Sequence, residues 1–354
     1  MPASYAIHRA QIEAILCSWG MDKANAELTA EVMAWADLHG IDSHGISMIT
    51  VYHERWQRGR LDITAQPTII KETPVSALIN GNAGLGHPTS RFAMNTAIVK
   101  AKEVGMAISS VRNSAHFGAC GFYAKMAADA GLIGMVTTSA SNRQVAPAGG
   151  KEARFGTDPL AFGAPGRDGA PFLLDMATTT TAAGRIRNKD NEGLPTPPGW
   201  LVTKEGLPST DPLEAREKGG FLTSLGATLE GGSYKGYGLA AMVNILSACL
   251  SGSTPITSPM HLKQPFGMDI GHFFMAIDPG LIRDPVEFRA EVISFCDALR
   301  SAKPVDPTKP VMVAGDPEWH CAAQRSVSGI PIGKGLLEKL RAIAAEHNAP
   351  WMLD

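Results

Sequence analysis

The sequence Arg112-Asn-Ser-Ala-His-Phe-Gly-Ala-Cys-Gly121 separates an apolar run at 106–111 from a stretch at 122–130 whose apolar residues recur at helical spacing. This order predicts a strand, a tight loop and a helix. His116 lies in the loop among small residues, with two glycines at the entrance to the helix. A histidine on a glycine-rich loop at the carboxyl end of a strand is well placed to meet a small molecule, so we expect a binding site here. The alternative is a histidine at the surface or in the packing.

Strand and helix patterns alternate on both sides of this loop. Extended segments are predicted at 68–80, 133–138, 160–164, 172–175, 271–278 and 311–314, and helices at 5–20, 22–39, 46–57, 88–102, 236–250, 286–302 and 335–347. The alternation predicts an α/β sheet protein. Residues 188–233 are rich in Gly, Pro and charge and are predicted to form a long surface excursion. The helix at 236–250 lacks a polar face and is expected to be buried, in the chain or at a subunit interface.

The composition narrows the class of protein. A chain of 354 residues with 44% hydrophobic and 19% charged residues can bury a large core and typically makes about two domains. The net charge of −2 favours neither nucleic acid nor an anionic membrane as partner. We see no signal peptide and no apolar run near the roughly 18 residues of a membrane span. The five cysteines form no CxxC pair, which indicates a reducing compartment, so we predict a cytoplasmic protein.

Ser43 and His44 form a second candidate site, in the turn Asp42-Ser-His-Gly45 before a predicted helix. A hydroxyl beside an imidazole can form one wall of a pocket. Alternatively, Ser43 caps the following helix and His44 is exposed in its first turn. Nucleophilic serine chemistry is disfavoured because Ser43 lacks a GxSxG elbow. His39 and His44 could suggest a metal pair, but no third ligand is near in the sequence, so we predict no metal site.

Two further loops carry groups suited to a nucleotide. Leu174-Asp-Met-Ala-Thr178 ends a predicted strand with a carboxylate followed by small and hydroxyl residues. Gly231-Gly-Ser-Tyr-Lys-Gly-Tyr-Gly238 carries Lys235 beside exposed backbone N–H groups, which favours an anion such as phosphate. The alternative is a solvated lysine on a hinge. Neither a GxGxxG fingerprint after a strand nor a GxxxxGK(S/T) phosphate loop is present.

Seven stretches, in order along nearly the whole chain, resemble those of the non-Rossmann malate/L-lactate dehydrogenase family. That family also includes ureidoglycolate and sulfolactate dehydrogenases, diketogulonate reductase and cyclic-imine reductases. Each stretch alone is a weak signal, but seven in the family's order are specific. They are Ile41-Asp-Ser-His-Gly45, Asn113-Ser-Ala-His-Phe-Gly118, Phe155-Gly-Thr-Asp-Pro-Leu160, Leu174-Asp-Met-Ala-Thr178, Tyr234-Lys-Gly-Tyr-Gly238, Gly271-His-Phe-Phe-Met-Ala-Ile-Asp-Pro279 and Gly315-Asp-Pro317.

The resemblance implies a homodimer with a three-layer α/β/α fold and a mixed sheet, like that of sulfolactate dehydrogenase, plus helical N- and C-terminal parts. It implies a substrate-side and dimerisation domain at 1–80 with 285–354, and a cofactor-binding α/β domain at 81–284 that includes the excursion. Ser43, His44 and His116 would line the substrate and nicotinamide site. NAD or NADP would be bound by Ser139, Ser141, Gly156, Thr157, Asp175, Met176, Ala177, Tyr234, Lys235, Gly315, Asp316 and Pro317. The preference between the two cofactors stays open, because no charged residue is placed at the ribose 2′ position.

This assignment is chemically consistent with the residues. Reduction of a 2-oxo acid needs a hydride, a proton donor at the developing alkoxide and a cation for the carboxylate. An imidazole with a near-neutral pKa suits reversible proton transfer. The sequence does not decide which of His44 and His116 is the acid. We favour His44, with Ser43 beside it, as the donor and place His116 at the carbonyl or the nicotinamide.

Two positions depart from the family pattern. Many members carry an arginine that can bind the substrate carboxylate at the position of Met48. Arg55 follows His44 by eleven residues, roughly 16 Å at helical rise, which is too far for the same small substrate. We therefore assign the substrate-binding cation to Arg143, in the loop 139–144. Asp158 stands where the family commonly has asparagine and adds a negative charge near the cofactor.

The predicted function is NAD(P)-dependent hydride transfer between nicotinamide and a small 2-oxo or 2-hydroxy acid. A cyclic imine carboxylate or ureidoglycolate is the alternative substrate, which Met48 supports. Two alternatives belong to other classes: a binding protein without turnover, and a serine hydrolase that uses Ser43. The presence of both His44 and His116 favours an enzyme over a binding protein.

Overall fold

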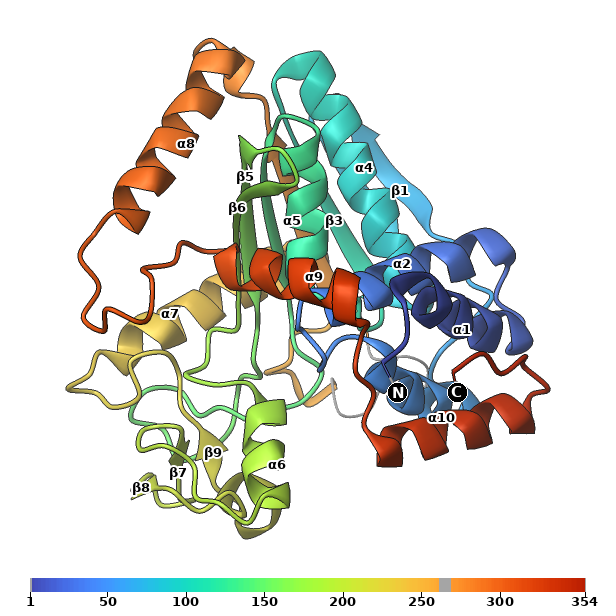
Figure 1. The fold of residues 1–354 in the computed structure, drawn as a ribbon, viewed down its shortest axis with the longest axis vertical. Helices are drawn as coiled ribbons and strands as arrows, with labels where there is room; N and C mark the ends of the chain where they lie inside the picture. The colour runs from blue at the N-terminus through green and yellow to red at the C-terminus, as the bar shows by residue number, and fades with distance from the viewer. Residues whose placement is uncertain (1, 261–268, 354) are drawn as a thin grey trace.

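A seven-stranded mixed sheet forms the centre of the molecule (Figure 1). The computed structural model describes residues 2–260 and 269–353. The strands lie in the order β1-β2-β3-β10-β4-β5-β6, and only the β2–β3 pair is parallel. Their bounds are β1 Thr68–Thr73, β2 Ser76–Asn80, β3 Met106–Ser114, β4 Ile133–Thr138, β5 Leu160–Arg167, β6 Ala170–Met176 and β10 Ile270–Ile277.

Helices cover both faces of this sheet. On one face lie α4 (Gly86–Val104) and α5 (Cys120–Asp129), which pack on alternate residues of the central strands. Gly163 and Gly134 let α5 approach closely: a β-carbon at Gly163 would lie 2.5 Å from the Ala124 carbonyl oxygen. The opposite face contacts α8 (Pro285–Arg300) and the π-helical turn η3 (Ile245–Cys249) that continues α7 (Ser233–Asn244). The predicted three-layer α/β/α fold with a mixed sheet is confirmed.

The N- and C-terminal helices build a second core beside the sheet. It is formed by α1 (Tyr5–Ser18), α2 (Lys23–Leu38), α3 (Ile49–Gln57) and α10 (Lys334–Glu346), with α3 preceded by the 3-10 turn η1 (Ile46–Met48). The two chain ends lie close together in Figure 1, and Gln11 bonds to the backbone of Pro350 and Met352. The division of the chain at residues 80 and 285 stays a prediction. In the structure β1 and β2, which end at residue 80, belong to the same sheet as β3.

Several sequence predictions need correction. The prediction of a strand at 311–314 is wrong: this segment is irregular, and Ala314 accepts a hydrogen bond from the Leu173 amide without forming a strand pair with any described residue. Helix α9 (Asp316–Ser328) was not predicted, because its apolar face is short and Pro317 stands at its start. The segment 68–80 is a hairpin of two strands.

The region predicted as a surface excursion has structure of its own. It begins within α6 (Ala183–Asn191) and contains the π-helical turn η2 (Glu214–Lys218) and a small sheet of β7 (Leu201–Val202), β8 (Pro208–Ser209) and β9 (Phe221–Leu222). The helix predicted at 236–250 is not buried within the chain, because Leu239, Ile245 and Leu250 are 36%, 59% and 54% exposed. Among the described residues, no helix is both long and apolar enough to cross a membrane.

Candidate active site

The turn that carries Ser43 and His44 is held against the end of α2. The carboxylate of Asp37 accepts hydrogen bonds from the Ile46 amide (2.7 Å) and from His8 Nε2 (2.6 Å). Gly45 passes so close to Asp37 that a β-carbon there would overlap this carboxylate. Burial raises the pKa of Asp37, partly offset by the His8 bond. The buried carboxylate therefore fixes the start of the turn.

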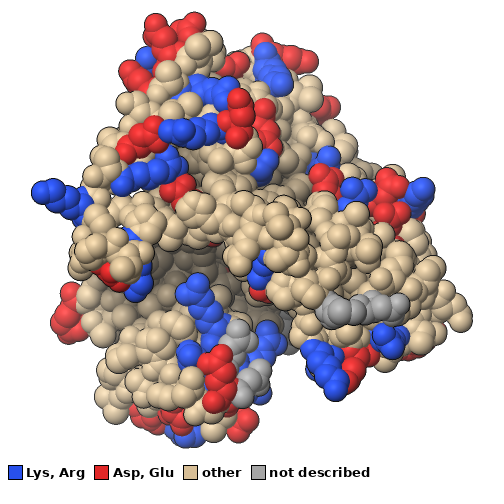
Figure 2. Space-filling model, in the orientation of Figure 1, with Lys and Arg blue, Asp and Glu red and all other residues tan. Residues whose placement is uncertain are grey.

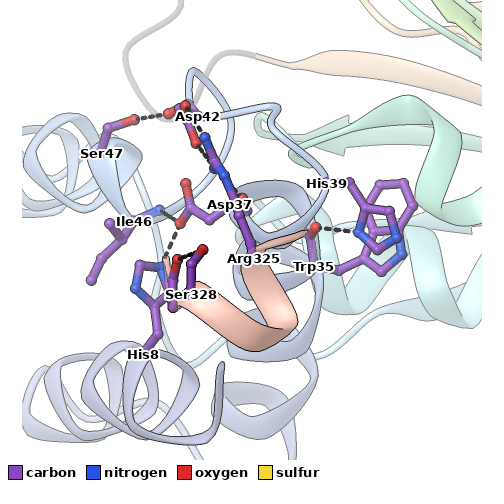
Figure 3. A network of polar contacts seen from close by, with 10 residues as sticks. His8, Trp35, Asp37, His39, Asp42, Ile46, Ser47, Arg325 and Ser328 are labelled. Carbon is purple, nitrogen blue, oxygen red and sulfur yellow. Dashed lines mark hydrogen bonds and ion pairs between the residues drawn. The ribbon is translucent and has the colours of Figure 1, made fainter. Parts of the chain in front are cut away.

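Helix α9 holds the other side of the same turn (Figure 3). Arg325 donates to both carboxylate oxygens of Asp42 and to the Asp37 carbonyl oxygen. Ser47 Oγ donates to the Asp42 carbonyl at 2.7 Å. Since α9 lies nearly three hundred residues away along the chain, the position of Ser43 and His44 depends on tertiary packing.

His44 and His116 come together in space. Their ring centroids are 5.4 Å apart with planes inclined at 27°, close to stacking. Ser43 Oγ lies 2.7 Å from His44 Nδ1, so the hydroxyl and the imidazole are bonded to each other. His116 follows the end of β3 and precedes α5, which is the strand, loop and helix predicted around it. The two candidate loops of the sequence thus form one site.

Tyr52 and the backbone define the state of His116. The Tyr52 hydroxyl lies 2.7 Å from His116 Nδ1, and the Gly118 amide lies 3.4 Å from the same atom. An amide N–H can only donate, so Nδ1 is an acceptor and the ring proton is on Nε2. Burial raises the pKa of Tyr52 far above its usual value, so its hydroxyl stays protonated and also donates. His116 therefore presents an N–H group on its free side.

The imidazoles of the site are held neutral. Burial lowers the pKa of His44 to about 4. Burial is the main cause that lowers the pKa of His116 well below its usual value. Electrostatic repulsion from His44, His87 and Arg55 lowers it further. His87 is fully buried, with its pKa lowered to about 3, and neither of its ring nitrogens has a hydrogen-bond partner within the described residues. A β-carbon at Gly118, which has φ of +80°, would lie 2.8 Å from His87 Nε2.

Three of the loops predicted to bind the cofactor are joined to one another. Asp158 is buried and accepts the amides of Ala140 and Gly156, both at 2.9 Å. The Thr157 carbonyl accepts the amide and the hydroxyl of Thr178. The loops 139–142, 156–158 and 175–178 thus form one continuous surface.

Asp175 connects this surface to the His116 loop. Its Oδ2 accepts the Gly121 amide, 2.6 Å away, in the first turn of α5. A carboxylate at this end of a helix is favoured by the helix dipole. Surrounding protein nevertheless raises the pKa of Asp175 to about 6, with the Gly121 bond acting against the rise. Although neighbouring atoms desolvate the carboxyl group, the residue as a whole keeps an exposed surface.

The remaining residues predicted to bind the cofactor have their polar groups engaged in different ways. Ser139 is buried and bonds to the backbone of Gly271, whereas Ser141, Met176 and Ala177 are half-buried. Lys235 and Tyr234 are exposed at the start of α7, with the ammonium 5.8 Å from the ring centroid. At the Gly315-Asp316-Pro317 turn, Asp316 accepts two bonds from Arg300, at 2.8 and 2.9 Å.

The candidate groups for the substrate carboxylate lie in different settings. Met48 is half-buried against the N-terminal core. Arg143 donates to the carbonyl oxygens of Ile256 (2.7 Å) and Ser258 (2.8 Å). Arg55 lies close enough to His116 to lower its pKa, and its buried Nη1 has no hydrogen-bond partner in the described part of the chain. From the sequence alone, Arg55 is excluded because of its distance from His44 along a helix. That distance does not describe how close Arg55 lies to His116 in the folded chain.

Comparison with known proteins places this geometry in a family. Residues 4–341 match the family model of malate/L-lactate dehydrogenase. The chain belongs to this family. Malate dehydrogenase from Pyrococcus horikoshii is 36% identical over 93% of this chain and 91% of its own. Among solved structures, malate dehydrogenase from Entamoeba histolytica has a TM-score of 0.94 at 32% identity, covering 99% of each chain.

A reductase has the same fold. The structure of Δ1-piperideine-2-carboxylate reductase from Pseudomonas syringae has a TM-score of 0.84 at 28% identity and covers 97% of this chain and all of its own. The family resemblance predicted from the seven motifs is confirmed, as is the prediction of an oxidoreductase that acts on CH–OH groups. Membership implies a nicotinamide cofactor.

The residues present fit such a cofactor. Figure 2 shows the molecule hollowed between the lobe of α6 and β7–β9 and the part that α9 crosses, with Lys and Arg side chains at the edge. Arg185 and Arg187 on α6 and Lys235 on α7 are exposed. Gly184 of α6 faces Ser43, since a β-carbon on this glycine would lie 3.7 Å from that of Ser43. Cations and hydroxyls near a pair of neutral imidazoles suit an anionic dinucleotide.

Sequence reasoning missed Tyr52, His87 and Arg325 as parts of this site. Tyr52 could have been suspected, because it lies two helical turns after His44 on a predicted helix and its hydroxyl can donate to an imidazole. His87 and Arg325 carry no such local signal. Their roles depend on contacts with residues far away in the chain.

Proposed function

We propose that this protein transfers hydride between a nicotinamide cofactor and a small 2-oxo or 2-hydroxy acid, of the malate or lactate type. The observation that carries the proposal is the pairing of two neutral imidazoles, His44 and His116, 5.4 Å apart at the joined cofactor loops. The bound nicotinamide supplies or accepts the hydride. The chain must then bind the acid, polarise its carbonyl and exchange one proton.

We assign the carbonyl to His116. Its Nε2–H is held by the Tyr52 and Gly118 bonds to Nδ1 and can donate to the substrate oxygen without changing its own charge. Proton exchange is assigned to His44, whose Nδ1 is bonded to Ser43. With a pKa of about 4, His44 is neutral near pH 7 and suited to take the hydroxyl proton during oxidation. An anionic substrate beside it would raise this pKa and so favour donation during reduction.

The substrate carboxylate requires a cation, and two arginines compete for this role in the proposal. Arg143, the residue assigned from the sequence, is anchored by two carbonyl oxygens and would act from the 139–144 loop. Arg55 is supported by its buried, unpaired Nη1 and its electrostatic effect on His116. Replacing each arginine by methionine separates them. The variant that lacks the carboxylate-binding arginine should have a higher KM for the 2-oxo acid. The other variant should have the wild-type KM.

For the cofactor, we propose NAD or NADP held by the residues assigned from the resemblance: Ser139, Ser141, Gly156, Thr157, Asp175, Met176, Ala177, Tyr234, Lys235, Gly315, Asp316 and Pro317. Asp158 accepts hydrogen bonds from the Ala140 and Gly156 amides and so joins two of these loops. We further propose a cytoplasmic homodimer. The exposed apolar side chains of Leu239, Ile245 and Leu250 support burial of α7 and η3 against a second subunit.

A cyclic imine carboxylate is the second candidate substrate, with ureidoglycolate beside it. Met48 stands where many family members have an arginine, and a reductase named for a cyclic imine carboxylate shares the fold. The imine nitrogen would take its proton from the protonated form of His44, which then returns to the neutral form.

The test is the loss of NADH or NADPH absorbance with a panel of 2-oxo acids, cyclic imine carboxylates and oxidised ureidoglycolate. We expect turnover with a 2-oxo acid that falls at least about a hundredfold in His44→Asn and in His116→Asn, the usual contribution of acid–base groups. Labelling of Ser43 by a fluorophosphonate would instead indicate a hydrolase. Tight cofactor binding without turnover of any member of the panel would contradict the proposal.

A further inference from the structure

A second cluster of titratable side chains lies where α3 meets the end of α10. Nε2 of His53 and Nε2 of His347 point at each other, 2.7 Å apart. The two carboxylate oxygens of Glu346 lie 3.7 Å from these nitrogens, one from each. Gln57 donates to Glu346 Oε1 at 2.7 Å, so the carboxylate is held in place from α3. None of these side chains belongs to the site of His44 and His116.

The surroundings of this cluster are closed on one side and open on the other. Trp19 and Trp56 stack at 5.3 Å and cover the imidazoles: Trp19 lies 5.3 Å from His53, and Trp56 lies 5.1 Å from His347. The His53 and His347 side chains are 10% and 18% exposed, whereas Glu346 is 51% exposed. A small ion can therefore enter past the carboxylate.

The position at a helix end favours a cation. Glu346 is the last residue of α10 and His347 is its C-cap. The carbonyl groups at a helix C-terminus carry partial negative charge, which attracts positive charge within the last turn. The carboxylate of Glu346 adds a full negative charge at the same place.

We propose that His53, His347 and Glu346 bind a divalent transition-metal ion of the zinc type. Zinc is held by imidazole nitrogens and carboxylate oxygens at about 2.0–2.1 Å, which puts neighbouring ligand atoms roughly 3.3 Å apart in a tetrahedron. The three separations here, 2.7, 3.7 and 3.7 Å, bracket that value. All three ligand atoms lie within 4.8 Å of one another. The fourth position is left to water.

The competing explanation is a plain hydrogen bond between two neutral imidazoles, one donating and one accepting. In that arrangement one proton lies between the nitrogens, and Glu346 is a solvated neighbour. A metal ion replaces this proton and recruits the carboxylate. Two imidazoles and one carboxylate favour Zn²⁺ or Co²⁺ over Mg²⁺, which prefers oxygen ligands. The bound ion would join the C-terminal helix α10 to α3. Its ligand His53 is next in the chain to Tyr52, which contacts His116.

The test uses the full chain without an affinity tag and does not depend on the proposed function. Binding of Zn²⁺ is measured by calorimetry, and binding of Co²⁺ by its visible absorption spectrum. We expect one ion per chain, tetrahedral Co²⁺ absorption and no competition by Mg²⁺. His347→Asn and Glu346→Gln should each lower Zn²⁺ affinity at least about tenfold, since even loss of a group that only orients a ligand costs that much.

His320→Asn is the matched control, because His320 is an exposed histidine on α9 outside the cluster. It should leave the affinity and the stoichiometry unchanged. Glu346→Gln keeps an acceptor for Gln57 and lies at the surface, so it remains informative if His347→Asn does not fold, as judged by circular dichroism. Equal Zn²⁺ binding by the wild type and Glu346→Gln, or equal losses in Glu346→Gln and His320→Asn, would overturn the proposal.

Discussion

Replacing Tyr52 by phenylalanine tests the reasoning about His116. Tyr52 is fully buried, so the change removes one oxygen and its 2.7 Å bond to Nδ1 and leaves the packing of the ring. The Gly118 amide at 3.4 Å remains as a weak donor to Nδ1. Loss of a buried partner costs about 1–3 kcal/mol, and with Gly118 retained we expect the lower part, about 1–2 kcal/mol.

The same energy should be lost in the transition state, because His116 is then no longer held in the Nε2–H form. We expect kcat to fall about five- to thirtyfold, since about 1.36 kcal/mol corresponds to a factor of ten. KM for the 2-oxo acid should hardly change, because Tyr52 contacts His116 and not the carboxylate. Nitrogen chemical shifts of labelled His116 should show a mixture of ring tautomers in the variant and mainly the Nε2–H form in the wild type.

Tyr123→Phe is the control for this experiment. Tyr123 is equally buried, in the core between the sheet and its helices, and its hydroxyl donates to the Phe117 carbonyl oxygen at 2.5 Å instead of to an imidazole. Both variants should lose similar stability in urea, but only Tyr52→Phe should change the His116 tautomer and kcat. A folded Tyr52→Phe variant with wild-type kcat would refute the role assigned to Tyr52.

Three further predictions concern the same site. For oxidation of the 2-hydroxy acid at saturating cofactor, which removes any effect of Asp175 on cofactor binding, kcat/KM should stay constant from pH 8 to about pH 5. It should fall only as the pH approaches 4, because neutral His44 must accept the proton and its pKa is about 4. A fall centred near the usual histidine value of about 6.5 would contradict this. Gly45→Ala should cost roughly 3 kcal/mol or more in urea unfolding, because its β-carbon overlaps the buried Asp37 carboxylate, whereas Gly238→Ala, in an open helical position, should be neutral or stabilising. Arg325→Met should lower kcat with little loss of stability, because it releases Asp42 and the Ser43-His44 turn, while Arg289→Met, which breaks an exposed pair with Asp168, should leave kcat unchanged.

The elements that could be predicted from the sequence are those that a local pattern specifies. Apolar residues at a spacing of three to four or of two define α4, α5, β4 and β10 within one or two residues and β3 within three, because each segment must bury one face. Short elements with few apolar residues escaped this rule. Helix α9 has a single buried residue, Asp316, and was missed. The apolar segment 311–314 was predicted as a strand, although none of the described strands pairs with it.

The sequence by itself also determined the family, because the seven motifs and their order can be recognised along the chain without knowledge of the structure. Only the tertiary structure decided which side chains meet. His44 reaches His116 because Asp37 and Arg325 fix its turn, and His53 reaches His347 across 294 residues of chain. Side-chain contacts between distant segments depend on how helices and strands pack. The periodic pattern of a helix or strand shows which face is buried but does not show which distant residue that face meets.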